Sequence, residues 1–142
     1  MIPAFINCII LLLISTIHFY WIAGGRWGLA NALPERNGAK TLKPGPLITL
    51  IVAIIFSAMG LFYLYKVEQF PVAHSWMPDW LNRYGLWLLA SVFLLRAVGD
   101  FRYVGFFKRV RNSRFAALDT RFYSPLCLFL SFNTFLLISF LS

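Results

Sequence analysis

The chain has 142 residues, of which 60% are hydrophobic and only 13% are charged. Soluble domains average about 45–50% apolar and about 25% charged residues, so this composition excludes an ordinary soluble domain and indicates a membrane protein. The net charge of +8 could also indicate a nucleic-acid partner, and the positions of the basic residues must decide between the two.

Four apolar stretches are each long enough to form a transmembrane helix, which needs about 20 residues. They cover residues of about 3–23, 46–65, 81–99 and 124–141. A proline opens three of them, and Ser124 is a natural N-cap for the last. No basic residue precedes the first stretch, so we expect a retained helix rather than a cleaved signal peptide. The sequence therefore predicts one all-α domain over residues 1–142, a polytopic membrane protein folded as a compact four-helix bundle.

Basic residues are concentrated in two of the three loops that connect these spans. The loops at 24–45 and 100–123 hold most of them, whereas the loop at 66–80 holds only Lys66. Short loops rich in Lys and Arg remain on the cytoplasmic side of a membrane. We therefore expect these two loops to be cytoplasmic, and the loop at 66–80 and both termini to lie outside. This arrangement explains the positive charge without nucleic acid.

Small residues form stripes on two of the predicted helices, and membrane helices pack through such stripes. The stripes are Thr49, Ala53, Ser57 and Gly60 in the second span, and Ser124, Cys127, Ser131 and Thr134 in the fourth. We expect both to face the interior of the bundle. A stripe left uncovered in the monomer would instead indicate a surface for a protein partner.

Ionisable residues at membrane depth are energetically costly, so they usually pair with one another or line a cavity. His18 and Arg96 lie near the cytoplasmic ends of the first and third spans, at similar depth. Asp100 follows Arg96 by one helical turn and Asp119 precedes the fourth span, so either carboxylate can pair with that arginine. The sequence thus predicts a polar pocket that opens to the cytoplasm. The candidate ligand-binding residues are His18, Arg26, Arg96, Asp100, Arg102, Asp119 and Tyr123.

Some of these residues also have a purely structural explanation. The segment "GGRWG" at 24–28 could present backbone amides beside Arg26 to a phosphate or carboxylate, or it could simply end the first helix. Arg96 could extend to the interface with Asp100 neutralising it, and His18 could bond to a neighbouring helix. The histidines and cysteines lack metal-ligand spacing, so we expect no metal and no cofactor. The basic, aromatic-rich loop at 100–123 indicates contact with the anionic lipid headgroups of the bilayer.

Four stretches resemble a known family: "HFYWIAGGRWG", "ALP" at 32–34, "RAVGDFRYVGFFKRV" and "FAALDTRFYSPLCL". They are similar to the small bacterial integral membrane proteins grouped as domain of unknown function 3995. The resemblance covers nearly the whole chain. It implies a four-helix, multi-pass protein of the bacterial cytoplasmic (inner) membrane, and it implies no assigned activity and no catalytic residues.

Three functions are compatible with these residues, and a non-enzymatic one is favoured. The first is binding of a small anionic molecule or a lipid headgroup in the cytoplasmic pocket, extending to transport, for which we expect a homodimer. The second is an accessory subunit that assembles a membrane complex. The third is an intramembrane enzyme for a lipid-like substrate, with His18 and either Asp100 or Asp119 as acid and base. A cavity that touches both His18 and Arg96 would favour the first.

Overall fold

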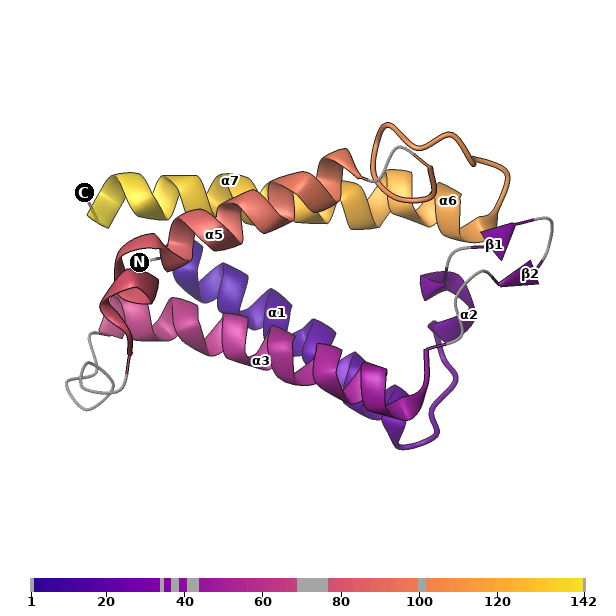
Figure 1. Cartoon of the computed structure of the whole chain (residues 1–142), viewed down its shortest axis with the longest axis horizontal. Coiled ribbons are helices and arrows are strands. Elements are labelled where there is room, and N and C mark those ends of the chain that lie inside the picture. Colours follow the sequence, from indigo (N-terminus) through magenta and orange to yellow (C-terminus); the bar gives the residue numbers. More distant parts are fainter. Residues whose placement is uncertain are drawn as a thin grey trace.

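The structure is a computed structural model, which describes residues 2–33, 35–36, 39–40, 44–68, 77–99 and 102–141. Four long helical segments dominate it, and each is long and apolar enough to cross a membrane. They are α1 (Ile2–Ile22), α3 (Pro46–Glu68), α5 (Asp79–Val98), and the continuous run of α6 (Arg114–Leu118), η1 (Asp119–Tyr123) and α7 (Ser124–Leu141). The predicted all-α fold with four transmembrane helices is therefore confirmed. Both ends of the chain lie at the same end of the molecule (Figure 1).

The fourth helical segment begins well before Ser124, its predicted N-cap. The N-cap is Ser113, whose side chain accepts a hydrogen bond from the backbone N–H of Ala116 at 3.0 Å. The helix continues through Ser124, whose backbone N–H donates to the carbonyl oxygen of Asp119 across the π-helical turn η1. Pro125 indicates a helix start in the sequence, but the wide π-turn before it accommodates the missing N–H and the ring inside a helix.

The four segments form two pairs of sequence neighbours, α1 with α3 and α5 with α7 (Figure 1). Gly60 allows close approach in the first pair, because a side chain there would press on Leu12. Ser15 of α1 donates to the carbonyl oxygen of Ala53 at 2.7 Å, and its hydroxyl lies 2.7 Å from that of Ser57. The small-residue stripe of α3 is thus covered by α1 within the monomer.

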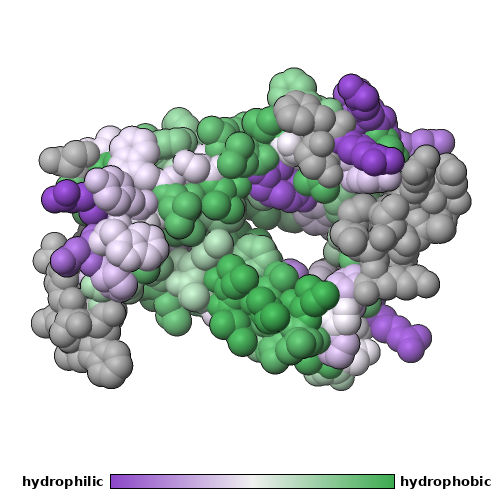
Figure 2. All heavy atoms as spheres, in the orientation of Figure 1, coloured by the Kyte–Doolittle hydropathy of each residue, from purple (hydrophilic) through white to green (hydrophobic). Residues whose placement is uncertain are grey.

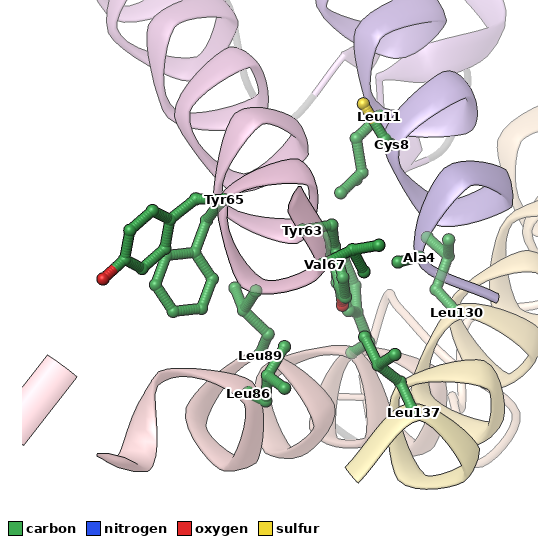
Figure 3. Close-up of a cluster of buried hydrophobic side chains, with 12 residues drawn as sticks. Ala4, Cys8, Leu11, Tyr63, Tyr65, Val67, Leu86, Leu89, Leu130 and Leu137 are labelled. Atoms are coloured by element: carbon green, nitrogen blue, oxygen red, sulfur yellow. The ribbon is translucent and has the colours of Figure 1, made fainter. Parts of the chain in front are cut away.

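The second pair is tied in the same way and meets the first pair at one end. Ser131 of α7 donates to the carbonyl oxygen of Ala90 in α5 at 2.8 Å. Gly85 of α5 lies against the ring of Phe62 in α3, with no room for a side chain between them. The buried apolar core fills this end (Figure 3), and it includes Ala4, Cys8, Leu11, Tyr63, Tyr65, Val67, Leu86, Leu89, Leu130 and Leu137.

A buried polar node, formed by Asn7, Tyr63, Asn133 and Thr134, joins the two pairs within this core. The side-chain amide of Asn7 donates to Thr134 Oγ1 at 3.1 Å, and the Tyr63 hydroxyl lies 2.6 Å from the same oxygen. Asn133 donates to Asn7 Oδ1 at 3.2 Å. Because the node contains side chains from α1, α3 and α7, it restrains how one helix pair sits on the other.

The two pairs diverge toward the opposite end, and a gap passes between them (Figure 2). Hydrophilic side chains border this gap on the side of α5 and α7 (Figure 2). α2 (Leu29–Ala32) lies at the wide end and contacts α6 (Figure 1). Nearby, β1 (Glu35–Arg36) pairs antiparallel with β2 (Ala39–Lys40). The bundle is therefore less compact than predicted, because several of the stripe residues make contacts within the pairs, whereas Thr134 joins the polar node between them.

Candidate functional site

A buried carboxylate joins the end of α5 to the start of the fourth helical segment. Arg96, in the last turn of α5, donates through Nη2 to Oδ1 of Asp119 at 3.0 Å. Lys108 donates through Nζ to Oδ2 at 2.9 Å, and the backbone N–H of Gly105 donates to the same oxygen at 2.7 Å. Both carboxylate oxygens are therefore occupied. We call Arg96, Lys108 and Asp119 the charged cluster.

Lys108 is the member of this cluster that the sequence does not single out. Only 1% of its side chain is exposed. Its Nζ also donates to the carbonyl oxygen of Gly105 at 3.0 Å and to Thr120 Oγ1 at 2.6 Å, so all three ammonium protons are used. In the sequence it is one of several basic loop residues. Its partner Asp119 is eleven positions away, so no local spacing marks it.

Two glycines shape the turn that brings Lys108 to Asp119. Gly99 has φ of +91° and Gly105 has φ of +88°, a left-handed conformation that favours glycine. Their backbones are in direct contact, so a Cβ on either would collide with the segment of the other. The N–H of Phe106 then donates to the carbonyl oxygen of Ala97 at 2.9 Å. The charged cluster is thus positioned by the backbone as well as by charge.

Two buried polar atoms next to the cluster have no hydrogen-bond partner among the described residues. They are Arg96 Nη1 and Ser124 Oγ. Ser124 is fully buried, whereas 34% of the Arg96 side chain is exposed. Tyr123 and Cys127, on the same helical segment as Ser124, lie within electrostatic reach of the Arg96 guanidinium. Arg96 therefore connects the buried carboxylate to a less enclosed region.

His18 does not join the charged cluster. Its Nδ1 lies 2.8 Å from the carbonyl oxygen of Ile14, and because a carbonyl only accepts, this nitrogen carries a proton. The ring lies 4.8 Å from that of Trp21 and 5.5 Å from that of Phe56, between centroids. Within the described part of the chain, no hydrogen bond joins His18 to the cluster.

His18 nevertheless lies on the face of α1 that is turned toward the other helix pair. It follows Asn7 by eleven residues, which is about three helical turns. Because Asn7 contacts α7 in the polar node, helical period predicts that His18 lies on the same face, three turns further from the node. By the same period, Tyr123 lies on the face of Thr134, eleven residues before it. Helical period therefore predicts that the two side chains lie on opposite walls of the gap.

The other predicted residues lie at the edge of this region or outside it. The Tyr123 hydroxyl donates to the carbonyl oxygen of Asn31 in α2 at 3.5 Å. The Arg102 side chain is exposed, with its guanidinium carbon 5.2 Å from the centre of the Tyr103 ring. Arg26 is also exposed. Asp100 lies outside the described residues.

The "GGRWG" segment forms the C-terminal cap of α1. The N–H of Gly25 donates to the carbonyl oxygen of Tyr20 at 3.0 Å, and the N–H of Gly24 donates to that of Trp21 at 3.1 Å. Gly24 has φ of +98°, which completes a Schellman cap. Both amides are thus used by helix carbonyls and are not free for an anion. The geometry favours the capping explanation of this segment.

A hollow of about 430 Å³ lies beside this cap. It is lined by Trp21, Ile22, Leu29, Leu33, Pro44, Pro46 and Thr49, none of which is ionisable. Among the described residues, no group of three or more His, Cys, Asp and Glu side chains is arranged to hold a metal ion. The hollow offers apolar surface without a charged group, so the charged cluster remains the candidate site.

The family model described as "Protein of unknown function (DUF3995)" matches residues 11–134, more than half of the chain. The chain belongs to this family. The matched range includes His18 and the whole charged cluster. No curated protein and no solved structure shows a significant match. Because the family has no assigned activity, its function has to be inferred from the site.

Proposed function

We propose that this protein binds a ligand with an anionic oxygen group, a phosphate or a carboxylate, on Arg96 at the wall of the gap. The observation that carries the proposal is that two buried atoms, Arg96 Nη1 and Ser124 Oγ, have no hydrogen-bond partner in the part of the chain that the structure describes. Native proteins leave few buried polar atoms without a hydrogen bond. A guanidinium nitrogen and a hydroxyl are donors from which phosphate and carboxylate oxygens accept.

The charge balance of the cluster supports an anion. Arg96 and Lys108 carry two positive charges and Asp119 carries one negative charge, so a bound anion would neutralise the remainder. Lys108 uses all its protons and Asp119 uses both its oxygens. With respect to the described residues, Arg96 is the member of the cluster that keeps a donor without a partner, and the Asp119 contact holds its planar guanidinium in one orientation.

The other two functions that the sequence allows receive less support. Acid–base catalysis by Asp119 would need a free carboxylate oxygen, and both are engaged with donors. An accessory role would be supported by an uncovered small-residue stripe, whereas Ser57 and Gly60 pack on α1. The positive charge of the loops supports a site on the cytoplasmic side. We therefore propose binding, of a small anion or a lipid headgroup, as the core of the function.

Inorganic phosphate and phosphatidylglycerol are the two probes that test this proposal. The purified protein in non-ionic detergent is titrated with each at constant ionic strength, and its thermal unfolding midpoint is measured. A ligand at about 100 times its Kd stabilises a protein by about 2.7 kcal/mol. We expect at least one probe to raise the midpoint of the natural protein and neither to raise that of Arg96→Gln.

Three further variants make the result specific. Arg83→Gln removes an exposed arginine from the same helix and should respond as the natural protein does. Ser124→Ala should weaken the response. Arg96→Lys keeps the charge facing Asp119 but loses the planar fork, so an intermediate response is expected. An unchanged response in Arg96→Gln, or no response to either probe in the natural protein, would show that the proposal is wrong.

A further inference from the structure

We infer that the ligand is a membrane phospholipid, with its phosphate on Arg96 and an acyl chain in the gap between the two helix pairs. This inference rests on the proposed function, from which it takes the anion site. It adds the chemical class of the rest of the ligand, which follows from the position and the walls of the gap.

The gap is open to the sides of the molecule. It lies between helical segments that are long and apolar enough to cross a membrane. It passes through the molecule between the pairs (Figure 2), while the polar node closes one end and α2 lies across the other. Openings between transmembrane helices in this direction face lipid rather than water. A ligand reaches them from within the bilayer.

The walls of the gap are apolar at the level nearest the polar node. Residues seven positions apart in a helix lie on the same face, about two turns apart. We therefore count seven positions from each node residue toward the gap. From Asn7, Tyr63 and Thr134 this step leads to Ile14, Phe56 and Cys127. All three are only partly buried, and Phe56 and Cys127 also pack against the buried core, so part of each side chain is left for another molecule to cover. A hydrocarbon chain is favourable cover for such a surface.

The walls become polar one helical turn further from the node. Helical period assigns His18 and Tyr123 to this level, three turns from Asn7 and Thr134, and Arg96 lies within electrostatic reach of Tyr123. A phospholipid has the same order, with hydrocarbon followed by a phosphate. Free phosphate would occupy the Arg96 end and leave the apolar level uncovered. A lipid matches both levels.

Chain-length dependence in the natural protein separates a lipid from free phosphate. The affinities of inorganic phosphate, glycerol 3-phosphate and long-chain lysophosphatidylglycerol are compared in the same detergent. We expect the long-chain compound to bind at least about tenfold more tightly than glycerol 3-phosphate, which corresponds to about 1.4 kcal/mol. Equal affinities would overturn the acyl-chain inference while leaving an anion site intact.

Large side chains placed in the gap test where the acyl chain lies. Cys127→Trp fills the apolar level from α7, and Ile14→Trp fills it from α1. The matched controls are Leu128→Trp and Leu13→Trp. These positions are next to Cys127 and Ile14 in the sequence, and their natural side chains are exposed. Retained phosphatidylglycerol is measured by native mass spectrometry, and helical content by circular dichroism.

The expected result is about a tenfold loss of lipid affinity in each folded gap variant and less than about a twofold change in the controls. The two gap variants come from different helices, so one can decide if the other fails to fold. Normal lipid retention in both, with phosphate binding lost in Arg96→Gln, would disprove the acyl-chain site but not the proposed function. Loss of neither in Arg96→Gln would disprove both.

Discussion

Asp119 is the residue on which the geometry of the site depends most. It is fully buried, and it accepts from two cationic side chains and one backbone amide. A buried ion pair that loses one partner destabilises a protein by about 3–5 kcal/mol, because the remaining charge stays out of water. The stability of this region should therefore be sensitive to the charge at this position.

We predict that Asp119→Asn lowers the free energy of unfolding by about 3 kcal/mol, because the fully enclosed ammonium of Lys108 then faces a neutral amide. The measurement is unfolding in mixed detergent micelles, followed by circular dichroism. Asp79→Asn, at an exposed position in the first turn of α5, should have the same free energy of unfolding as the natural protein. Equal stability of the two variants would contradict a stabilising role for the charged cluster.

At this scale the sequence predicts part of the site and misses the rest for a physical reason. Asp119 is identified as an acceptor for Arg96, because an arginine at the end of a span needs a nearby carboxylate. Lys108 is not identified, because its burial depends on a turn between distant residues rather than on its neighbours. His18 is expected to join Arg96, but its ring packs on Trp21 and Phe56 instead, and helical period alone does not indicate this separation.

At the scale of elements, the turn from Gly99 to Gly105 decides whether the cluster can form. Its two left-handed glycines touch backbone to backbone, and this contact places the Gly105 N–H and Lys108 against the same carboxylate oxygen. A side chain at either glycine meets both a steric and a conformational penalty.

Gly105→Ala should destabilise the protein by at least about 1–2 kcal/mol, which is the cost of a left-handed conformation for a residue with a Cβ. The backbone collision adds to this cost. Gly45→Ala is the control, since a Cβ there meets nothing within 4 Å and its φ is not in the left-handed region. Gly105→Ala should unfold at a lower temperature and be cleaved faster in limited proteolysis than Gly45→Ala. Equal unfolding and cleavage curves for the two variants would argue against a strained turn.

The helical elements themselves follow closely from the sequence, with one instructive exception. Four long apolar stretches predict four transmembrane helices, because backbone groups in lipid must be satisfied within a helix. The start of the last one is misjudged, because Ser124 and Pro125 have the local pattern of a helix start. The π-turn at 119–123 allows the helix to continue through Ser124 and Pro125. We know of no local sequence pattern that predicts such a turn.

At the scale of the whole molecule, the two helix pairs are each tied internally and joined to one another mainly at one end. The polar node performs this joining with buried hydroxyl and amide groups. Hydrogen bonds between membrane helices contribute about 0.6 kcal/mol on average, so the node is a moderate restraint rather than a rigid lock. The width of the gap should therefore depend on it.

Thr134→Val removes the oxygen that Asn7 and Tyr63 share, and we predict a loss of about 1 kcal/mol in stability. Thr16→Val is the matched control, because that hydroxyl is exposed and donates within its own helix, to the carbonyl oxygen of Leu12. A change in stability of the same size in both variants would show that the node does not hold the pairs together.

The same substitution should also broaden the distance between the pairs. Spin labels at the exposed positions Ile17 and Phe129 report this distance by pulsed electron paramagnetic resonance. Thr134→Val is expected to give a wider distribution of distances between the two labels than the natural protein, whereas Thr16→Val is not. An unchanged distribution would mean that contacts other than the node set the width of the gap.

The distribution of basic residues predicts that both termini lie outside the cytoplasm. A C-terminal fusion to alkaline phosphatase should then be active, and a C-terminal fusion to green fluorescent protein should be dark. The opposite pattern would reverse the orientation and place the Arg96 end of the gap on the outer side.

Pairing between sequence neighbours also has a consequence for how the protein is made. α1 and α3 are complete before α5 and α7 leave the ribosome, and each hairpin can insert as a unit before the two dock. The gap does not exist until that docking step. A lipid lying between the hairpins at that moment would occupy the gap from the start, and it could still exchange with the bilayer through the open sides of the gap (Figure 2).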